Sequence, residues 1–280
     1  MPYCEVASDV SLYYEDFGSG PPVVFTAAGS LTHKMWEGQV AALASQYRTI
    51  TYDWRGTGES DKPRAGYTPD TLASDLCNLV ERLDLAPAVL VGHGIGSHVT
   101  LLAAAARPDL TRGIVLASAA PWFGGDLDGV SAGLSRDFIA FLQRANEFGD
   151  PRGVPYPQAC AELAEQWLFH HPQPAAVHHA ILEQALSWPQ VVINTIARNL
   201  VGLDHRQRLA QLACPTLIIQ GRHDRKQRYQ GAVYLAQRIR NARLVTLENS
   251  AHMGQIEELN AFNAALHEFL KTAHRVEHAA

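Results

Sequence analysis

The sequence has few cysteines, no excess of positive charge and no apolar run long enough to cross a bilayer. Its four cysteines, among 280 residues, show neither a C-x-x-C motif nor metal-ligand spacing, which argues against a disulfide framework or a zinc site. A net charge of -5 provides no basic field for nucleic acid. We therefore expect a cytoplasmic monomer or homodimer that acts on a small molecule, stays off membranes and nucleic acid, and needs no metal or organic cofactor.

Short apolar runs alternate with amphipathic segments along most of the chain. The runs, each typical of a buried parallel strand, are Val23–Ala27, Thr49–Tyr52, Ala88–Val91, Ile114–Ala117, Thr216–Gln220 and Leu244–Leu247. The segments with helical spacing are Asp70–Leu83, Ser97–Ala106, Gly231–Arg240 and Glu257–Lys271. This alternation predicts an α/β fold with a doubly wound, mostly parallel sheet, and an opening hairpin near Val10–Asp16 would form its antiparallel edge.

One stretch, residues 123–203, breaks the alternation. It is rich in Leu, Ala, His, Gln and Trp and is interrupted by prolines, a composition that predicts several short helices. We expect a helical cap at 123–203, inserted into a core formed by 1–122 and 204–280. Such a cap would cover the carboxyl ends of the strands, where open α/β sheets bind ligands.

The residues LVGHGIGSH, 90–98, join a predicted strand to a predicted helix. Glycines at 92 and 96 give the pattern G-x-Nuc-x-G of a nucleophile elbow, whose central residue is normally Ser, Cys or Asp. Here the centre is Gly94, which avoids backbone strain on the order of 1 to 3 kcal/mol but has no nucleophilic side chain. Ser97 lies about one helical turn further on and is not expected to replace it.

Three further segments stand in a fixed order around this elbow. They are Asp53–Ser60, which reads D-x-R-G-x-G-x-S, then Gly221–Asp224, and finally Asn249–His252. With them the chain resembles the capped α/β-hydrolases, of the lactonase-like and aminoacrylate-hydrolase-like kinds, over nearly its whole length. The resemblance implies an eight-stranded sheet, Asp224 as the acid and His252 as the base of a catalytic group.

The chemistry of an Asp-His pair agrees with this resemblance. A neutral imidazole serves as a base near pH 7 when a carboxylate holds its other nitrogen in the correct tautomer. Considered singly, Asp224 would be a surface residue in a charged run and His252 a solvated loop histidine. The resemblance also implies an oxyanion hole of backbone N–H groups, which we assign to Gly29 and Ile95, although Ala27-Ala28 replaces the family's usual His-Gly pair.

Other residues are candidates for contact with substrate. Ala28, His93, Trp122 and Phe123 are predicted to contact it, with His93 alternatively a packed histidine beside the elbow. Four cations around Asp224, at positions 222, 225, 226 and 228, favour either an anionic substrate or simply a solvated surface. The histidine pairs at 170–171 and 178–179 lack the carboxylate pattern of a metal motif, so we predict no metal site.

Three functions remain open for an elbow without a nucleophile. In the first, His252 and Asp224 activate a water that attacks a carbonyl, lactone, ester, enamine or imine directly. In the second, the natural protein has serine at 94 and the chain is a disabled variant of an ester or lactone hydrolase. In the third, the protein binds a small molecule without catalysis. The same His-Asp base would also serve elimination or cofactor-free oxygenation.

Overall fold

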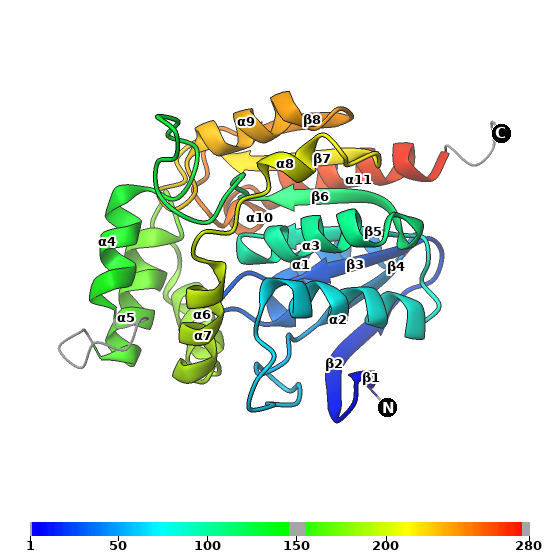
Figure 1. The fold of residues 1–280 in the computed structure, drawn as a ribbon, viewed down its shortest axis with the longest axis horizontal. Coiled ribbons are helices and arrows are strands. Elements are labelled where there is room, and N and C mark those ends of the chain that lie inside the picture. Colours follow the sequence, from blue (N-terminus) through cyan, green and yellow to red (C-terminus); the bar gives the residue numbers. More distant parts are fainter. Residues whose placement is uncertain (1, 146–154, 276–280) are drawn as a thin grey trace.

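The computed structural model describes residues 2–145 and 155–275 of the chain. Its centre is an eight-stranded sheet in the order β1-β2-β4-β3-β5-β6-β7-β8 (Figure 1). The strands are β1 Tyr3–Ala7, β2 Val10–Phe17, β3 Pro22–Thr26, β4 Arg48–Tyr52, β5 Ala88–His93, β6 Thr111–Ala117, β7 Thr216–Gly221 and β8 Ala242–Leu247. β1 pairs antiparallel with β2 and β2 antiparallel with β4, whereas the other neighbours are parallel. The predicted fold class, with its hairpin edge, is confirmed.

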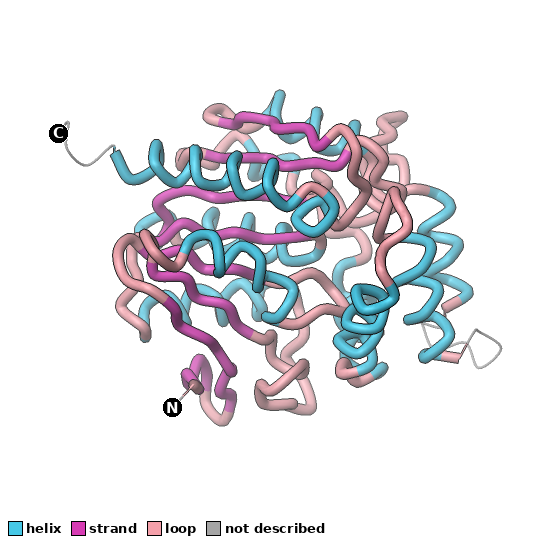
Figure 2. Tube along the Cα trace, turned by 180° about the vertical axis from the view of Figure 1, so that it is seen from behind, coloured by secondary structure: helices cyan, strands magenta, loops and turns pink. Residues whose placement is uncertain are grey.

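Helices cover both faces of this sheet (Figure 2). The helices flanking the sheet are α1 Glu37–Leu43, α2 Pro69–Arg82, α3 Ile95–Ala106, α9 Tyr229–Arg238, α10 Gly254–Glu257 and α11 Leu259–Arg275. Two buried apolar clusters result, one containing residues of α2, α3 and α9 and the other containing residues of α1 and α11. Successive side chains of a strand point to opposite faces of the sheet, which explains why there are two clusters. In β5, Leu90 belongs to the first cluster, whereas Val89 and Val91 belong to the second.

The segment between β6 and β7 is helical, as its composition predicts. Its elements are α4 Arg136–Arg144, α5 Tyr156–Glu162, the π-helical turn Leu163–Trp167, α6 Ala175–Leu186, α7 Gln190–Leu200 and α8 Arg206–Leu209. In Figure 1 α4 to α7 stand beyond the carboxyl ends of the strands. The division into a cap at 123–203 and a core stays a prediction, and residues 146–154 and 276–280 lie outside the described residues.

The central strands position the site. β3 and β5 are neighbours, and Thr26 at the end of β3 pairs in register with Gly92 of β5. From these two ends the chain continues in opposite directions along the sheet, to β4 and to β6. Such a switch point leaves a crevice between the two loops, where open α/β sheets bind ligands. No helix in the part of the chain that the structure describes is long and apolar enough to span a membrane.

Candidate active site

The chain turns sharply at Gly94, between β5 and α3, as the glycines at 92, 94 and 96 predict. Gly94 has φ +56° and ψ -118°, a conformation that side-chain-bearing residues rarely adopt. Gly96 allows α3 to pass close to β3, because a Cβ there would lie 2.4 Å from the carbonyl oxygen of Ala27. Ser97 donates its hydroxyl to the carbonyls of Gly92 and Ala117, at 2.8 and 2.9 Å, so it is directed away from His252, as expected.

Asp224 and His252 come together behind the elbow. Asp224 follows β7, His252 follows β8, and His252 donates its Nδ1–H to Oδ2 of Asp224 at 2.8 Å. Both residues are buried. Since Nδ1 carries the hydrogen, Nε2 has a free lone pair, and an ideal Cβ on Gly94 would lie 3.3 Å from that Nε2. The nitrogen with the free lone pair therefore faces the space beside Gly94.

The carboxylate of Asp224 is held by a set of amide donors. Oδ1 of Asp224 accepts the backbone N–H groups of Lys226 and Gln227 at 2.8 and 3.0 Å, and Oδ2 also accepts Nε2–H of Gln220 at 3.0 Å. Burial alone would raise the pKa of Asp224, but His252 and the backbone N–H groups of Gln227 and Lys226 lower it below its ordinary value. The carboxylate is therefore ionised and correctly placed to orient the imidazole.

Burial lowers the pKa of the His252 imidazole below its usual 6.5, and the Asp224 charge opposes this shift. The neutral, basic form of His252 therefore prevails at neutral pH. The loop that carries it is anchored through its carbonyl, which accepts the Ser118 hydroxyl at 2.7 Å and the His93 ring at 2.8 Å. Ser118, directly after β6, was missed by the sequence analysis, although the carboxyl end of a central strand was the signal that could have indicated it.

A small cavity of about 50 Å³ lies over Gly94. Its walls contain predicted and unpredicted residues: Ala28, Gly29, Ser30, Gly94, Ile95, Phe123, Phe138, Leu163, Ile193, Ala197, Lys226, Gln227 and His252. The predicted residues in this set come from the loops after β3, β5 and β6 and from the His252 loop. The others come largely from α4, the π-helical turn and α7, which the sequence could not orient.

Two residues predicted to contact substrate do not line this cavity. Trp122 is buried elsewhere, where its indole donates to the carbonyl of Gly125 at 2.7 Å and packs edge-on against Tyr234. His93 is buried beneath His252, 4.7 Å between ring centroids, and its Nε2 is occupied by the His252 carbonyl. Burial above all lowers the pKa of His93 far below its usual value, so it is a neutral packed histidine.

The two residues predicted to provide the oxyanion donors, Gly29 and Ile95, lie next to each other. A Cβ on Gly29 would lie 2.6 Å from Cδ1 of Ile95, so the loop after β3 lies directly against the start of α3. Ile95 is the first residue of α3, and a first-turn N–H has no partner within its own helix. By contrast, the amide of Ala28 donates to Sδ of Met35 at 3.1 Å and is occupied.

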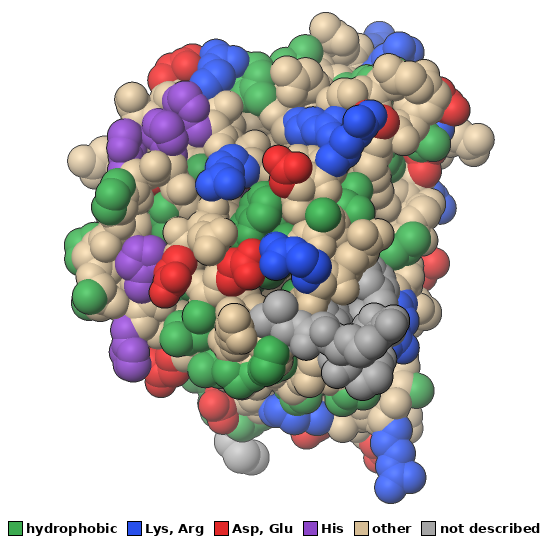
Figure 3. All heavy atoms as spheres, turned by 90° about the vertical axis from the view of Figure 1, so that its left-hand side faces the viewer, with side chains coloured by type: hydrophobic (Ala, Val, Ile, Leu, Met, Phe, Trp, Pro, Cys, Tyr) green, Lys and Arg blue, Asp and Glu red, His purple; other side chains and the backbone are tan. Residues whose placement is uncertain are grey.

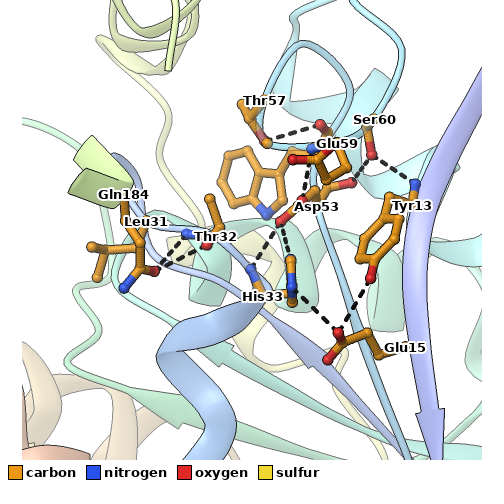
Figure 4. A network of polar contacts seen from close by, with 12 residues as sticks. Tyr13, Glu15, Leu31, Thr32, His33, Asp53, Thr57, Glu59, Ser60 and Gln184 are labelled. Carbon is orange, nitrogen blue, oxygen red and sulfur yellow. Dashed lines mark hydrogen bonds and ion pairs between the residues drawn. The ribbon is translucent and has the colours of Figure 1, made fainter. Parts of the chain in front are cut away.

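A polar network holds the loop that carries Gly29 (Figure 4). Oδ1 of Asp53 accepts both the backbone N–H and Nδ1–H of His33, at 2.9 and 2.8 Å, and its Oδ2 accepts the amide of Glu59 at 3.0 Å. On the other side, the amide and hydroxyl of Thr32 donate to Gln184 of α6 at 3.2 and 3.0 Å. The D-x-R-G-x-G-x-S segment thus fixes the predicted oxyanion loop.

The surface at the α4 to α7 end mixes acidic and basic side chains, with histidines gathered along one side (Figure 3). His170 stacks on His223 at 3.7 Å between ring centroids and contacts His171 at 4.4 Å. Parallel stacked rings do not direct their nitrogens at one ion. Across residues 2–145 and 155–275, no group of three or more His, Cys, Asp or Glu side chains has a metal-binding arrangement.

Comparison with known proteins decides the family. Residues 21–259 match the family described as alpha/beta hydrolase fold. The chain belongs to the α/β-hydrolase fold family. It is 30% identical over 275 residues to the AB hydrolase superfamily protein YisY of Bacillus subtilis, covering 95% of this chain and 98% of that protein. The prediction of an α/β-hydrolase family enzyme is confirmed.

Two further relatives agree with this family. The putative carbamate hydrolase RutD of Azorhizobium caulinodans is 25% identical, over 95% of this chain and 97% of that protein. Among solved structures, an esterase from Exiguobacterium antarcticum has a TM-score of 0.86 at 27% identity, over 94% of this chain and 96% of its own.

Proposed function

We propose that the protein hydrolyses a small carbonyl, ester, lactone, enamine or imine substrate by direct attack of a water that His252 activates. The observation that carries this proposal is the distance of 3.3 Å between Nε2 of His252 and the Cβ position of Gly94, over which a cavity of about 50 Å³ opens. A site of this size holds a water or a small substrate group, and a water requires polar partners such as Nε2 and amide N–H groups.

In the proposed reaction on an ester or lactone, Nε2 of His252 removes a proton from the water while the water oxygen attacks the carbonyl carbon. An enamine first takes a proton from solvent at its β-carbon to become the imine form, whose C=N carbon is then attacked in the same way. Asp224 stabilises the resulting imidazolium through the Nδ1–H bond of 2.8 Å. For an ester or lactone, the N–H groups of Gly29 and Ile95 would stabilise the negative charge that develops on the carbonyl oxygen. His252 then returns its proton to the leaving group, so the base is regenerated and no bond to the protein forms.

Specific residues complete this proposal. Ala28 and Phe123 would contact the substrate, because both line the cavity. The helices of 123–203 would act as a cap, because Phe138 and Leu163 close the cavity from that side. The lactonase-like and aminoacrylate-hydrolase-like resemblance supports small, reactive substrates. The solved enol-lactonase of Burkholderia xenovorans resembles this chain with a TM-score of 0.82. Its sequence identity is only 24%, so this likeness supports the fold and not the substrate.

One observation favours a second candidate function. The same distance of 3.3 Å would bring the hydroxyl of a serine at position 94 within reach of Nε2. A protein whose natural residue is serine would then hydrolyse esters or lactones through an acyl-enzyme.

The test is to incubate the chain with activated esters, lactones and short enamine acids, stop the reaction in acid, and measure both product and protein mass. Hydrolysis without a covalent adduct is the expected result. Hydrolysis with an acyl adduct would refute direct water attack. Binding without turnover across the whole panel would identify a small-molecule binding protein instead.

A further inference from the structure

Residues 166–171, which we call the bridging segment, contact both loops that carry the proposed catalytic pair. The segment begins within the π-helical turn Leu163–Trp167, whose Leu163 lines the cavity over Gly94. π-helical turns are rare and occur frequently at functional sites. The segment therefore connects the wall of the cavity with the loops after β7 and β8.

On one side, the bridging segment contacts the loop after β7. Nη1 of Arg225 donates to the carbonyl of Gln166 at 2.9 Å, and the ring of His170 stacks on that of His223 at 3.7 Å between centroids. His223 and Arg225 are the two neighbours of Asp224 in the sequence. The position of the proposed acid is thus tied to the bridging segment from both sides.

On the other side, the bridging segment contacts the loop after β8. The backbone N–H of Met253 donates to the carbonyl of Leu168 at 3.0 Å. Both residues are buried, so this hydrogen bond is shielded from water. Because Met253 directly follows His252, the bridging segment also holds the neighbour of the proposed base.

Glu257 of α10 joins the bridging segment to the residue on the other side of His252. Its Oε1 accepts the backbone N–H groups of His170 and His171 at 2.7 and 3.0 Å, and its Oε2 accepts that of Ala251 at 2.7 Å. Hydrogen bonds from N–H groups to a carboxylate are charge-assisted and stronger than neutral ones. One side chain thereby connects two segments that are about 80 residues apart in the sequence.

This connection requires an ionised carboxylate, because only a carboxylate has an acceptor at both ends of the group. A glutamine has one acceptor oxygen and one NH₂ group, so at position 257 it would present a donor to an N–H on one side or the other. Glu257 is half-buried, and water can reach the N–H groups that it leaves. Its loss should therefore loosen the connection without unfolding the chain.

We propose that Glu257 is a positioning residue, which keeps the His252 imidazole in place on the Asp224 carboxylate by joining the bridging segment to the loop after β8. The bond of 2.8 Å between Nδ1–H of His252 and Oδ2 of Asp224 joins these two loops, so it depends on their relative position. The inference rests on the proposed function for its effect on the rate, whereas its effect on the His-Asp bond requires no turnover.

The test compares Glu257→Gln with Glu258→Gln, its matched control. Glu258 accepts the N–H of Asn249 and the hydroxyl of Ser250 at 2.9 and 2.5 Å, both through Oε2, so one glutamine oxygen can keep both bonds. The control removes the same charge beside the same loop, and within the described residues no hydrogen bond joins Glu258 to the bridging segment. Thermal unfolding verifies that each variant is folded.

Three quantities are measured for each variant. The first is the proton resonance of the His252 Nδ1–H, which hydrogen bonding to a carboxylate moves far downfield and which is assigned by its loss in His252→Gln. The second is the hydrogen exchange of the backbone amides of His170, His171 and Ala251. The third is kcat and KM on any activated substrate that the chain hydrolyses.

In Glu257→Gln we expect faster exchange of the amides on one side of position 257, and an Nδ1–H resonance that moves upfield and weakens through exchange with water. The kcat should fall about ten- to hundredfold with little change in KM, because a displacement of about 1 Å costs a rate of that order. Glu258→Gln should match the unmodified chain. Glu257→Asp keeps the charge and both oxygens, so it should retain more of the resonance than Glu257→Gln, and it serves as the test variant if Glu257→Gln does not fold.

An unchanged Nδ1–H resonance in Glu257→Gln, or the same change in Glu258→Gln, would overturn the inference. If the unmodified chain hydrolyses no substrate, the proposed function fails, and the resonance still decides whether Glu257 positions His252. Hydrolysis at an equal rate in Glu257→Gln with an unchanged resonance would leave the proposed function standing and refute the role of Glu257.

Discussion

A hydroxymethyl group placed at position 94 has consequences that the structure specifies in detail. In Gly94→Ser the new Cβ would lie 3.3 Å from Nε2 of His252 and 3.7 Å from Cβ of Ala28, so it fits with shifts of a few tenths of an ångström. Its hydroxyl can then reach hydrogen-bond distance from Nε2 while the Asp224 bond is kept. The Asp-His pair should accordingly activate the serine for attack.

The substitution should also destabilise the fold by a calculable amount. Strain at a φ of +56° costs about 1 to 3 kcal/mol for a residue with a Cβ, and the lower entropy of the unfolded chain offsets about 0.4 to 1 kcal/mol. The net loss is about 1 to 2 kcal/mol. With an unfolding entropy of about 2.1 cal/mol/K per residue over 280 residues, Tm should fall by about 2 to 3 °C.

Stopped-flow kinetics with p-nitrophenyl acetate and protein mass spectrometry provide the assay, and Gly94→Ala is the matched control. Both variants should show the same fall in Tm, but only Gly94→Ser should give a burst of p-nitrophenol and gain one acetyl group. If Gly94→Ser neither acetylates nor differs from Gly94→Ala in rate, the imidazole is not positioned as a base toward the elbow, and the reasoning fails.

Three other predictions concern pH and stability. Because burial lowers the pKa of His252, its neutral form persists below pH 6.5, and the acid limb of the kcat/KM profile should lie below that value; a limb above it would contradict the assignment. Burial also lowers the pKa of His98 to about 4. As pH drops from 6.5 toward 4, His98 is therefore protonated in the unfolded chain but not in the folded one, and the free energy of unfolding should fall. His98→Gln should make this fall shallower in urea titrations, and an unchanged slope would count against it. Asp75→Asn leaves buried Arg55 without the carboxylate that it contacts at 2.5 Å and should cost about 3 to 5 kcal/mol by urea denaturation, whereas a loss below about 1 kcal/mol would show that the pair contributes little.

The sequence predicted those features that depend on local pattern. The apolar runs around Leu90 and Val115 located the central strands, and the glycines beside Gly94 indicated the elbow. Placement of Asp224 and His252 together followed from the resemblance, because spacing along the chain does not determine which loops meet.

What the sequence could not predict depends on long-range packing. Trp122 was expected to contact substrate, but it is buried against Tyr234, which is distant in sequence. For His93 the sequence left contact with substrate and packing beside the turn both open, and it is buried against His252. Lys226 was one of four similar cations, and only the course of the chain after Asp224 separates it from Arg225. The residues between 123 and 203 that line the cavity, such as Phe138, lie on helices whose orientation cannot be read from sequence periodicity.

The most direct test of the central claim is the rate of hydrolysis by the chain with glycine at 94, compared with that of His252→Ala on the same activated substrate. General-base catalysis contributes about 10² to 10⁴ in rate, so His252→Ala should lose at least about a hundredfold in kcat/KM while keeping its fold. Equal rates in the two proteins would contradict the activation of water by His252.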